Sequence, residues 1–302
     1  MNKLTTQARA QILTALAEGN SINATCRMLT VNKVTVLRLL ADAGTFAQLY
    51  HDAHVRGLDT EHVQCDEIWA FVHCKKANTP KHLLGVFGVG DVWTWTGLDS
   101  DSKLMIQWRV GRRDTGDAVA FMRDLASRLN GHVQVTTDGL QSYEPAVAHA
   151  FGVSRRSDYA QCIKEYGDET GLVGAERKYS PGRCTGVEIK VKWGDPDPDE
   201  ITTSHVERAN LTVRMGNRRF TRLTNGFSKK VENHRHMLAI QFLHYNFIRR
   251  HMTIKTTPAI KAGITDRYWT MLDFVELMER EESANGGRLT DYKPSASIRR
   301  GN

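Results

Sequence analysis

The spacing of hydrophobic positions changes twice along the chain and divides it into three kinds of region. Residues 4–43 carry apolar side chains at three- and four-residue intervals, which predicts three short helices. Between residues 62 and 138, apolar and β-branched residues come in shorter runs that are typical of strands. From Ser204 the helical spacing returns and continues through residues 229–251. The pattern therefore predicts helices, then an α/β region, then helices again.

The first three helices have the arrangement of a helix-turn-helix unit. Asn32 is placed to cap the third helix, which we expect to end at Gly44. In this interpretation Lys33, Thr35 and Arg38 face the major groove of DNA. The alternative is a small packing domain without DNA contacts, because helical triplets are common.

The middle region predicts an α/β fold around a mixed sheet. Three strands joined as a meander are followed by a helix, a further strand and another helix. Residues 152–203 break this rhythm with many Gly, Pro and acidic residues, and we expect them to form an irregular insertion with one strand. The expected strands lie at 62–75, 82–100, 103–111, 132–138 and 187–193, and the helices at 117–130 and 142–152.

Composition excludes several classes of protein. The 302 residues are 40% hydrophobic and 25% charged, and no apolar run is long enough to span a bilayer. The five cysteines are scattered and include no CxxC pair, which argues against a disulfide framework or a structural zinc site. We therefore expect a cytoplasmic protein without membrane contacts.

Charge is distributed unevenly along the sequence. The formal net charge is +7, yet the segment from His205 to Ala262 alone holds twelve Lys or Arg and two acids. A basic segment of this density is typical of a surface that binds phosphates and predicts a nucleic-acid partner. A solvated helical face is the alternative.

Three acids stand out by their positions. Asp66 lies in the middle of the first strong strand, Asp138 at the end of a later strand, and Glu207 on the helix that begins near Ser204, which we expect to cap it. Such acids can converge on a site for Mg²⁺ or Mn²⁺, with two ions acting on a phosphodiester. Each could instead have a local role: a backbone partner for Asp66, a turn for Asp138, a surface ion pair for Glu207. Glu67 competes for any role given to Asp66.

Four stretches carry a resemblance to a known family. QCDEIWAFVHCKK, TTDGLQSY and SHVERANLTVRMGNRRFTRLTNGFSKKVENH resemble transposases of the insertion-sequence-one type, as does HYNFIRRHMTIKTTPAIKAGITDRYW. The resemblance spans about residues 20–275. It implies a DDE transposase with a ribonuclease-H-like core, with Asp66, Asp138 and Glu207 as the catalytic, metal-binding triad. Many members begin with a cysteine-rich zinc-binding segment that this sequence lacks, so we expect recognition of the element's ends to differ here.

The residue pattern and the resemblance together predict partners and domain boundaries. The expected units are a helix-turn-helix domain (1–45), a linker (46–61), a ribonuclease-H-like catalytic domain (62–250) with its insertion, and a C-terminal helical region with a loose tail (251–302). We expect a nucleoid-associated protein that works as a homo-oligomer on double-stranded DNA, joining terminal inverted repeats to target DNA. A DNA-binding regulator with an inactive core, or a nuclease that cuts without joining, are the alternatives. The basic helical region and its polar neighbours would hold DNA through Arg208, Asn210, Arg214, Arg218, Arg219, Arg222, Lys229 and Lys230.

Overall fold

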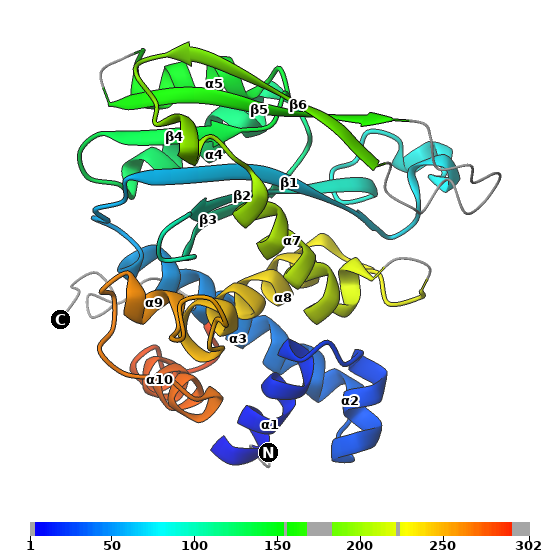
Figure 1. Cartoon of the computed structure of the whole chain (residues 1–302). Coiled ribbons are helices and arrows are strands. Elements are labelled where there is room, and N and C mark those ends of the chain that lie inside the picture. Colours follow the sequence, from blue (N-terminus) through cyan, green and yellow to red (C-terminus); the bar gives the residue numbers. More distant parts are fainter. Residues whose placement is uncertain (1–3, 154–155, 168–182, 222–223, 292–302) are drawn as a thin grey trace.

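A six-stranded mixed sheet forms the upper half of the molecule and a layer of helices the lower half (Figure 1). The structure is a computed structural model that describes residues 4–153, 156–167, 183–221 and 224–291. The strand order is β3-β2-β1-β4-β5-β6, so β1 and β4 lie at the centre. The strands are β1 (His62–Val72), β2 (Gly90–Asp99), β3 (Met105–Gly111), β4 (Val133–Thr137), β5 (Ser157–Gly167) and β6 (Arg183–Trp193).

The direction of the strands gives the sheet its mixed character. The meander β1-β2-β3 is antiparallel, β4 and β5 run parallel to β1, and β6 pairs antiparallel with β5. The hairpin turn expected at residues 99–102 is present, where the Asp99 carboxylate accepts a hydrogen bond from the Asp101 amide at 3.0 Å.

The expectation of five strands was wrong, because the sheet has six, and residues 152–203 are not merely an irregular insertion. The missed strand is β5, which continues the parallel part of the sheet next to β4. The strand expected at 187–193 is present as β6, which pairs with β5. The polar residues of β5, DYAQCIKEYG, hide its strand character. They are tolerated because the second half of the strand is only partly covered.

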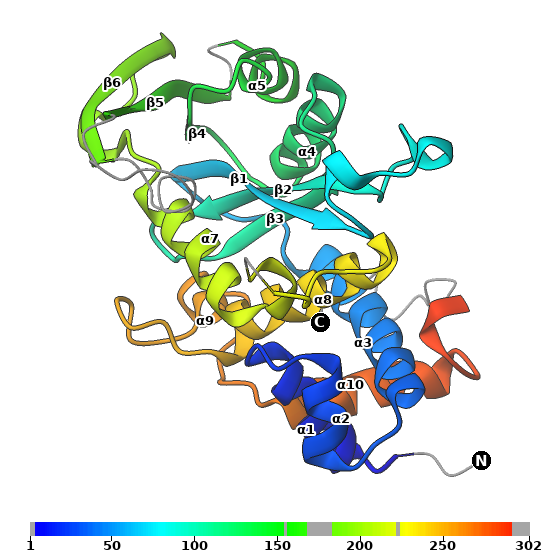
Figure 2. The same cartoon turned by 90° about the vertical axis from the view of Figure 1, so that its right-hand side faces the viewer.

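Helices cover both faces of the sheet (Figures 1 and 2). The pair α4 and α5 lies over one face, and α7 crosses the other and contacts β1 and β2. Beneath α7, α8 packs along α3, and α1 packs against α10. Among the described residues, none of the helices has the length and apolar character needed to cross a membrane. The helices are α1 (Thr6–Ala17), α2 (Ile22–Leu29), α3 (Lys33–His54), α4 (Thr115–Ser127), α5 (Tyr143–Phe151), α7 (Ser204–Gly216), α8 (Val231–Leu243), α9 (Pro258–Lys261) and α10 (Met271–Ala284).

The third helix does not end at Gly44, and most of the expected linker at 46–61 belongs to it. α3 continues to His54, and its second half buries Phe46, Ala47 and His51. A Cβ built at Gly44 would lie 2.3 Å from the Cβ of His236 on α8. The glycine therefore serves a close crossing of α3 and α8 and not a helix end.

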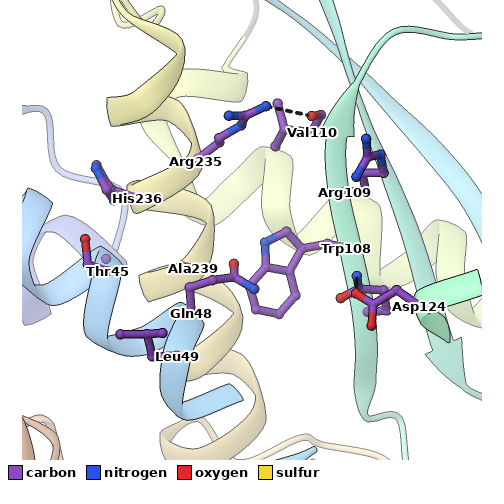
Figure 3. A pocket seen from close by; sticks show the side chains of 12 residues that line it. Thr45, Gln48, Leu49, Trp108, Arg109, Val110, Asp124, Arg235, His236 and Ala239 are labelled. Carbon is purple, nitrogen blue, oxygen red and sulfur yellow. Dashed lines mark hydrogen bonds between the residues drawn. The ribbon is translucent and has the colours of Figure 1, made fainter. Parts of the chain in front are cut away.

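The β3 edge of the sheet is closed by side chains of the helical layer. The His51 ring donates to the Ile106 carbonyl at 2.8 Å, and the Asn246 side chain bonds both backbone groups of Met105 at 2.9 Å. Burial lowers the pKa of His51 to about 3, so the ring is neutral at this contact. Figure 3 shows the Arg235 guanidinium donating to the Val110 carbonyl, beside a pocket of about 530 Å³. Capping of this kind prevents another strand from pairing with β3.

Candidate functional site

The three acids singled out in the sequence line one pocket. It has a volume of about 900 Å³ and lies between the sheet, α7 and the loop that follows β4. Asp66 comes from the middle of β1, Asp138 from the residue after β4, and Glu207 from the first turn of α7. Glu67 and Lys164 also line it. The pocket thus collects four carboxylates from three separate parts of the chain.

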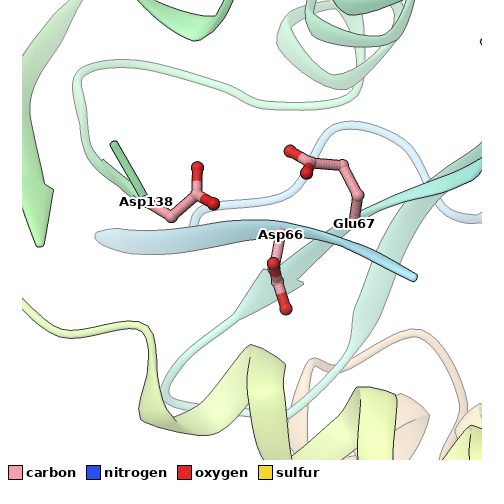
Figure 4. Close-up of side chains that lie close together, drawn as sticks. All are labelled: Asp66, Glu67 and Asp138. Carbon is pink, nitrogen blue, oxygen red and sulfur yellow. The ribbon is translucent and has the colours of Figure 1, made fainter. Parts of the chain in front are cut away.

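Asp66, Glu67 and Asp138 form the tightest group. One carboxylate oxygen from each lies within 4.8 Å of the others, a spacing that could hold a metal ion. Neighbouring residues of a strand point to opposite faces, and Figure 4 shows Asp66 turned toward α7 and Glu67 turned away from it. Asp138 lies at the end of β4, close to both (Figure 4). Glu207 lines the pocket but is not in this group.

Asp66 is fixed by a polar contact to α7. The Asn210 amide donates to Asp66 Oδ2 at 2.8 Å, and its oxygen accepts from the Thr96 hydroxyl at 3.1 Å. Asn210 is only 1% exposed. Its burial and its bond to Asp66 favour a positioning role over the DNA contact expected from the sequence, which stays a prediction.

Glu67 is the most buried acid of the pocket. Its side chain is 1% exposed, its Oε2 accepts from Arg113 at 3.1 Å, and its Oε1 has no hydrogen-bond partner. The Arg113 guanidinium also lies 4.0 Å from Asp138 and stacks over the Trp93 ring. A single guanidinium therefore faces two of the three grouped carboxylates.

Crowding and burial change the acidity of the group. Burial raises the pKa of Asp66 to about 6, and the charges of Asp138 and Glu207 add to the effect. Burial and then the charge of Asp138 raise the pKa of Glu67 to about 7. Burial also raises the pKa of Asp138. The cluster therefore resists full ionisation near neutral pH unless a further cation is present.

The donor set fits a hard divalent cation. All three grouped ligands are carboxylate oxygens, which suit Mg²⁺ or Mn²⁺ better than the softer metals that prefer sulfur. A bound cation would offset both the burial, which is the main cause of these raised pKa values, and the repulsion between the carboxylates.

Glu207 is held by a lysine. Both its carboxylate oxygens lie 2.5 Å from Lys164 Nζ on β5, and the Thr203 hydroxyl donates to Oε1 at 2.6 Å. Ser204 does not cap α7, contrary to our expectation. Gln64 of β1 does so from across the fold, since its Oε1 accepts the His205 and Val206 amides at 3.0 and 3.2 Å. The cap thus ties the start of α7 to the strand that carries Asp66.

A second, basic pocket lies at the other end of α7. It has a volume of about 360 Å³ and borders the turn between α1 and α2, the start of α3 and the segment that joins α7 to α8. Its described lining contains no acid and five of the cations expected to bind DNA: Lys33, Arg218, Arg219, Lys229 and Lys230. Glu207 and Asn217 stand ten residues apart, which is about 15 Å of helix. The acid pocket and the basic pocket therefore lie at opposite ends of α7.

The other expected DNA contacts are dispersed. Thr35 and Arg38 line a different pocket from Lys33, beside Arg9 and Arg288, so these three residues of α3 do not share one face. Arg208 is exposed and lines a further pocket with Arg249 and Arg250. Arg214 lines the acid pocket, and Arg222 lies outside the described residues.

Sequence reasoning missed Lys164, Arg113 and Gln64, and it treated Glu67 only as a competitor of Asp66. Lys164 was hidden because β5 was not recognised as a strand. The period-two placement of Gln64 and Asp66 on β1 puts both on one face, and this signal could have indicated that they act together.

No protein-family model matches the chain, and no curated protein matches it. Among solved structures, the chain is similar to a piggyBac transposase in a synaptic complex with hairpin DNA. The TM-score is 0.45 and the sequence identity 10%, over 92% of this chain and 71% of that chain. A likeness at this level assigns no function to this chain.

Proposed function

We propose that the chain is a DNA transposase with a ribonuclease-H-like core, which hydrolyses phosphodiester bonds and transfers strands. The observation that carries the proposal is the convergence of Asp66, Asp138 and Glu207 on one pocket. The neighbouring basic pocket supports DNA as the substrate. The resemblance of the sequence to insertion-sequence-one-type transposases points the same way.

The residues of the pocket have distinct roles in this proposal. Asp66 and Asp138 would hold divalent metal, with Glu67 as a further carboxylate beside them. Two Mg²⁺ or Mn²⁺ ions would supply charge that activates the attacking oxygen and stabilises the leaving one. Glu207, which Lys164 binds in this structure, would complete the set, and the Asn210 amide keeps Asp66 aimed into the pocket.

Strand transfer in Mg²⁺ tests the proposal. The substrate is double-stranded DNA that copies the sequence bounding the gene, and the product measured is a covalent joint to target DNA. We expect Asp138→Asn and Glu207→Gln to lose the joint, whereas the exposed hairpin variant Asp101→Asn keeps it. Activity that survives both substitutions would contradict the assignment of these acids.

The same assay separates the alternatives. A nuclease that only cuts would give shortened strands without joints. A regulator with an inactive core would bind its DNA equally well in EDTA and release no cleaved product. Glu67→Gln, measured beside Glu207→Gln, shows which glutamate the reaction needs in addition to the two aspartates.

The basic pocket predicts a salt-dependent affinity for DNA. Replacement of Lys229 and Lys230 with Ala removes two cations, so the slope of log affinity against log salt concentration should become shallower by about two. Lys261→Ala, an exposed lysine outside the pocket, is the matched control. An unchanged slope in the double variant would exclude this pocket as a phosphate site.

A further inference from the structure

The two edge strands of the sheet, β3 and β6, differ in how their outer sides are covered. The β3 edge is closed by side chains of His51, Asn246 and Arg235. At the other edge, β6 pairs with β5 only, and no other described strand adjoins it. Proteins normally blunt an edge strand, because its free backbone groups pair with any strand that approaches. The β6 edge is protected only by charged side chains, Glu188, Lys190 and Lys192, and not by a described helix or strand paired with its outer side.

The exposed part of β6 is apolar in alternation. Val187, Ile189 and Val191 are 54%, 49% and 53% exposed, and they share one face because alternate residues of a strand point the same way. Their pairing with β5 is regular over this stretch, from Lys164 opposite Val187 to Ala160 opposite Val191. A row of three β-branched side chains on a free edge is typical of a strand that pairs with another chain.

The charged residues between these three apolar positions indicate which chain would pair with β6. Glu188 and Lys190 lie on the opposite face of β6 and contact each other at 2.9 Å. From this arrangement we infer that β6 pairs antiparallel with β6 of a second copy of this chain, about a two-fold axis at Ile189. The axis places Glu188 opposite the partner's Lys190, and Val187 opposite the partner's Val191. Both charged pairs and the whole apolar row are then matched.

Neighbouring registers do not match. An axis at Glu188 would set two glutamates opposite each other, and an axis at Lys190 would set two lysines opposite each other. An axis between residues would bring charged side chains opposite apolar ones. Only the register centred on Ile189 is complementary at every position from 187 to 191, and like charges directly opposite are destabilising.

The interface lies next to the acid pocket. Lys164, which binds Glu207, is the residue of β5 that pairs with Val187. Pairing through β6 would join the two sheets edge to edge and bring two acid pockets close to the axis. The inference stands on the geometry of β6, and it deepens the proposed function, because a transposase has two DNA ends to bring together.

Sedimentation of the full-length chain over a wide range of concentrations, in EDTA and without DNA, tests the interface. We expect a reversible dimer. Glu188→Lys and Lys190→Glu should each weaken it roughly tenfold, because each creates two like-charged pairs across the axis. An equimolar mixture of the two variants should restore the dimer, since each introduced charge then meets an opposite one, and so should the double swap.

The mixture is the decisive control. Each single variant loses the bond between Glu188 and Lys190 within its own strand, so a purely structural effect would persist in the mixture. Monomers at every concentration, a dimer that neither substitution weakens, or a mixture that stays dissociated would each overturn the inference. Because the measurement contains neither metal nor DNA, its outcome is independent of whether the chain transfers strands.

Discussion

Replacement of Asp66 with Asn should stabilise the metal-free protein while removing its metal site. The pKa of Asp66 is raised from 3.8 to about 6, chiefly by burial. The folded-state pKa lies above the unfolded one, so the carboxyl's stabilising contribution is complete below about pH 4 and is lost as the pH rises through about 6. Above that pH, the ionised side chain destabilises the fold.

The pKa difference sets the size of the effect. A shift of about two units corresponds to about 3 kcal/mol at full ionisation, and the solvent at the mouth of the pocket reduces this to roughly 1–2 kcal/mol. The asparagine retains an oxygen to accept from Asn210, so the contact to α7 survives. The variant should therefore exceed the wild type in free energy of unfolding by roughly 1–2 kcal/mol near pH 8.

Urea unfolding in EDTA measures this difference, and Asp101→Asn serves as the exposed control. The advantage of the variant should shrink as the pH falls toward about 4. Addition of Mg²⁺ should stabilise the wild type more than the variant, because only the wild type keeps the full carboxylate set. A variant that is less stable than the wild type near pH 8, or an advantage independent of pH, would refute the reasoning.

Three further predictions follow from single contacts. Lys164→Met should tighten Mn²⁺ binding several-fold in calorimetry, because it frees a carboxylate for the metal; weaker binding would contradict the role given to this lysine. Gly44→Ala should cost about 2–3 kcal/mol in thermal unfolding through its clash with His236. Gly116→Ala, which meets only one oxygen at 3.4 Å, should cost nothing. Gln64→Leu should speed hydrogen exchange of the amides at the start of α7, and an unchanged rate would exclude the cap.

Local patterns predicted the parts of the site that lie on strongly patterned elements. The apolar residues around Asp66 indicated a central strand, and β1 is one. The short run that ends in Asp138 is β4, and the helical spacing around Glu207 is α7. In each case the side chains that pack the core also define the element, so the pattern was sufficient.

The rest depends on contacts between distant residues, which local patterns do not record. β5 is a polar strand that is held mainly by its neighbours in the sheet, so its alternation is weak and Lys164 was missed. A glycine such as Gly44 commonly follows the end of a helix. Only the close approach of α8 shows that this glycine permits a helix crossing instead. The cap of α7 comes from Gln64, far away in the sequence, while the adjacent Ser204 is unused.

α7 carries Glu207 in its first turn and ends at the basic pocket. The length of this helix therefore sets the distance between the place where DNA would be held and the place where it would be cut. An α-helix turns by about 100° and advances by about 1.5 Å for each residue. A single residue gained or lost within α7 would therefore rotate its two ends out of phase without unfolding either pocket. The length of this helix is therefore a geometric requirement of the proposed site in addition to the acids themselves.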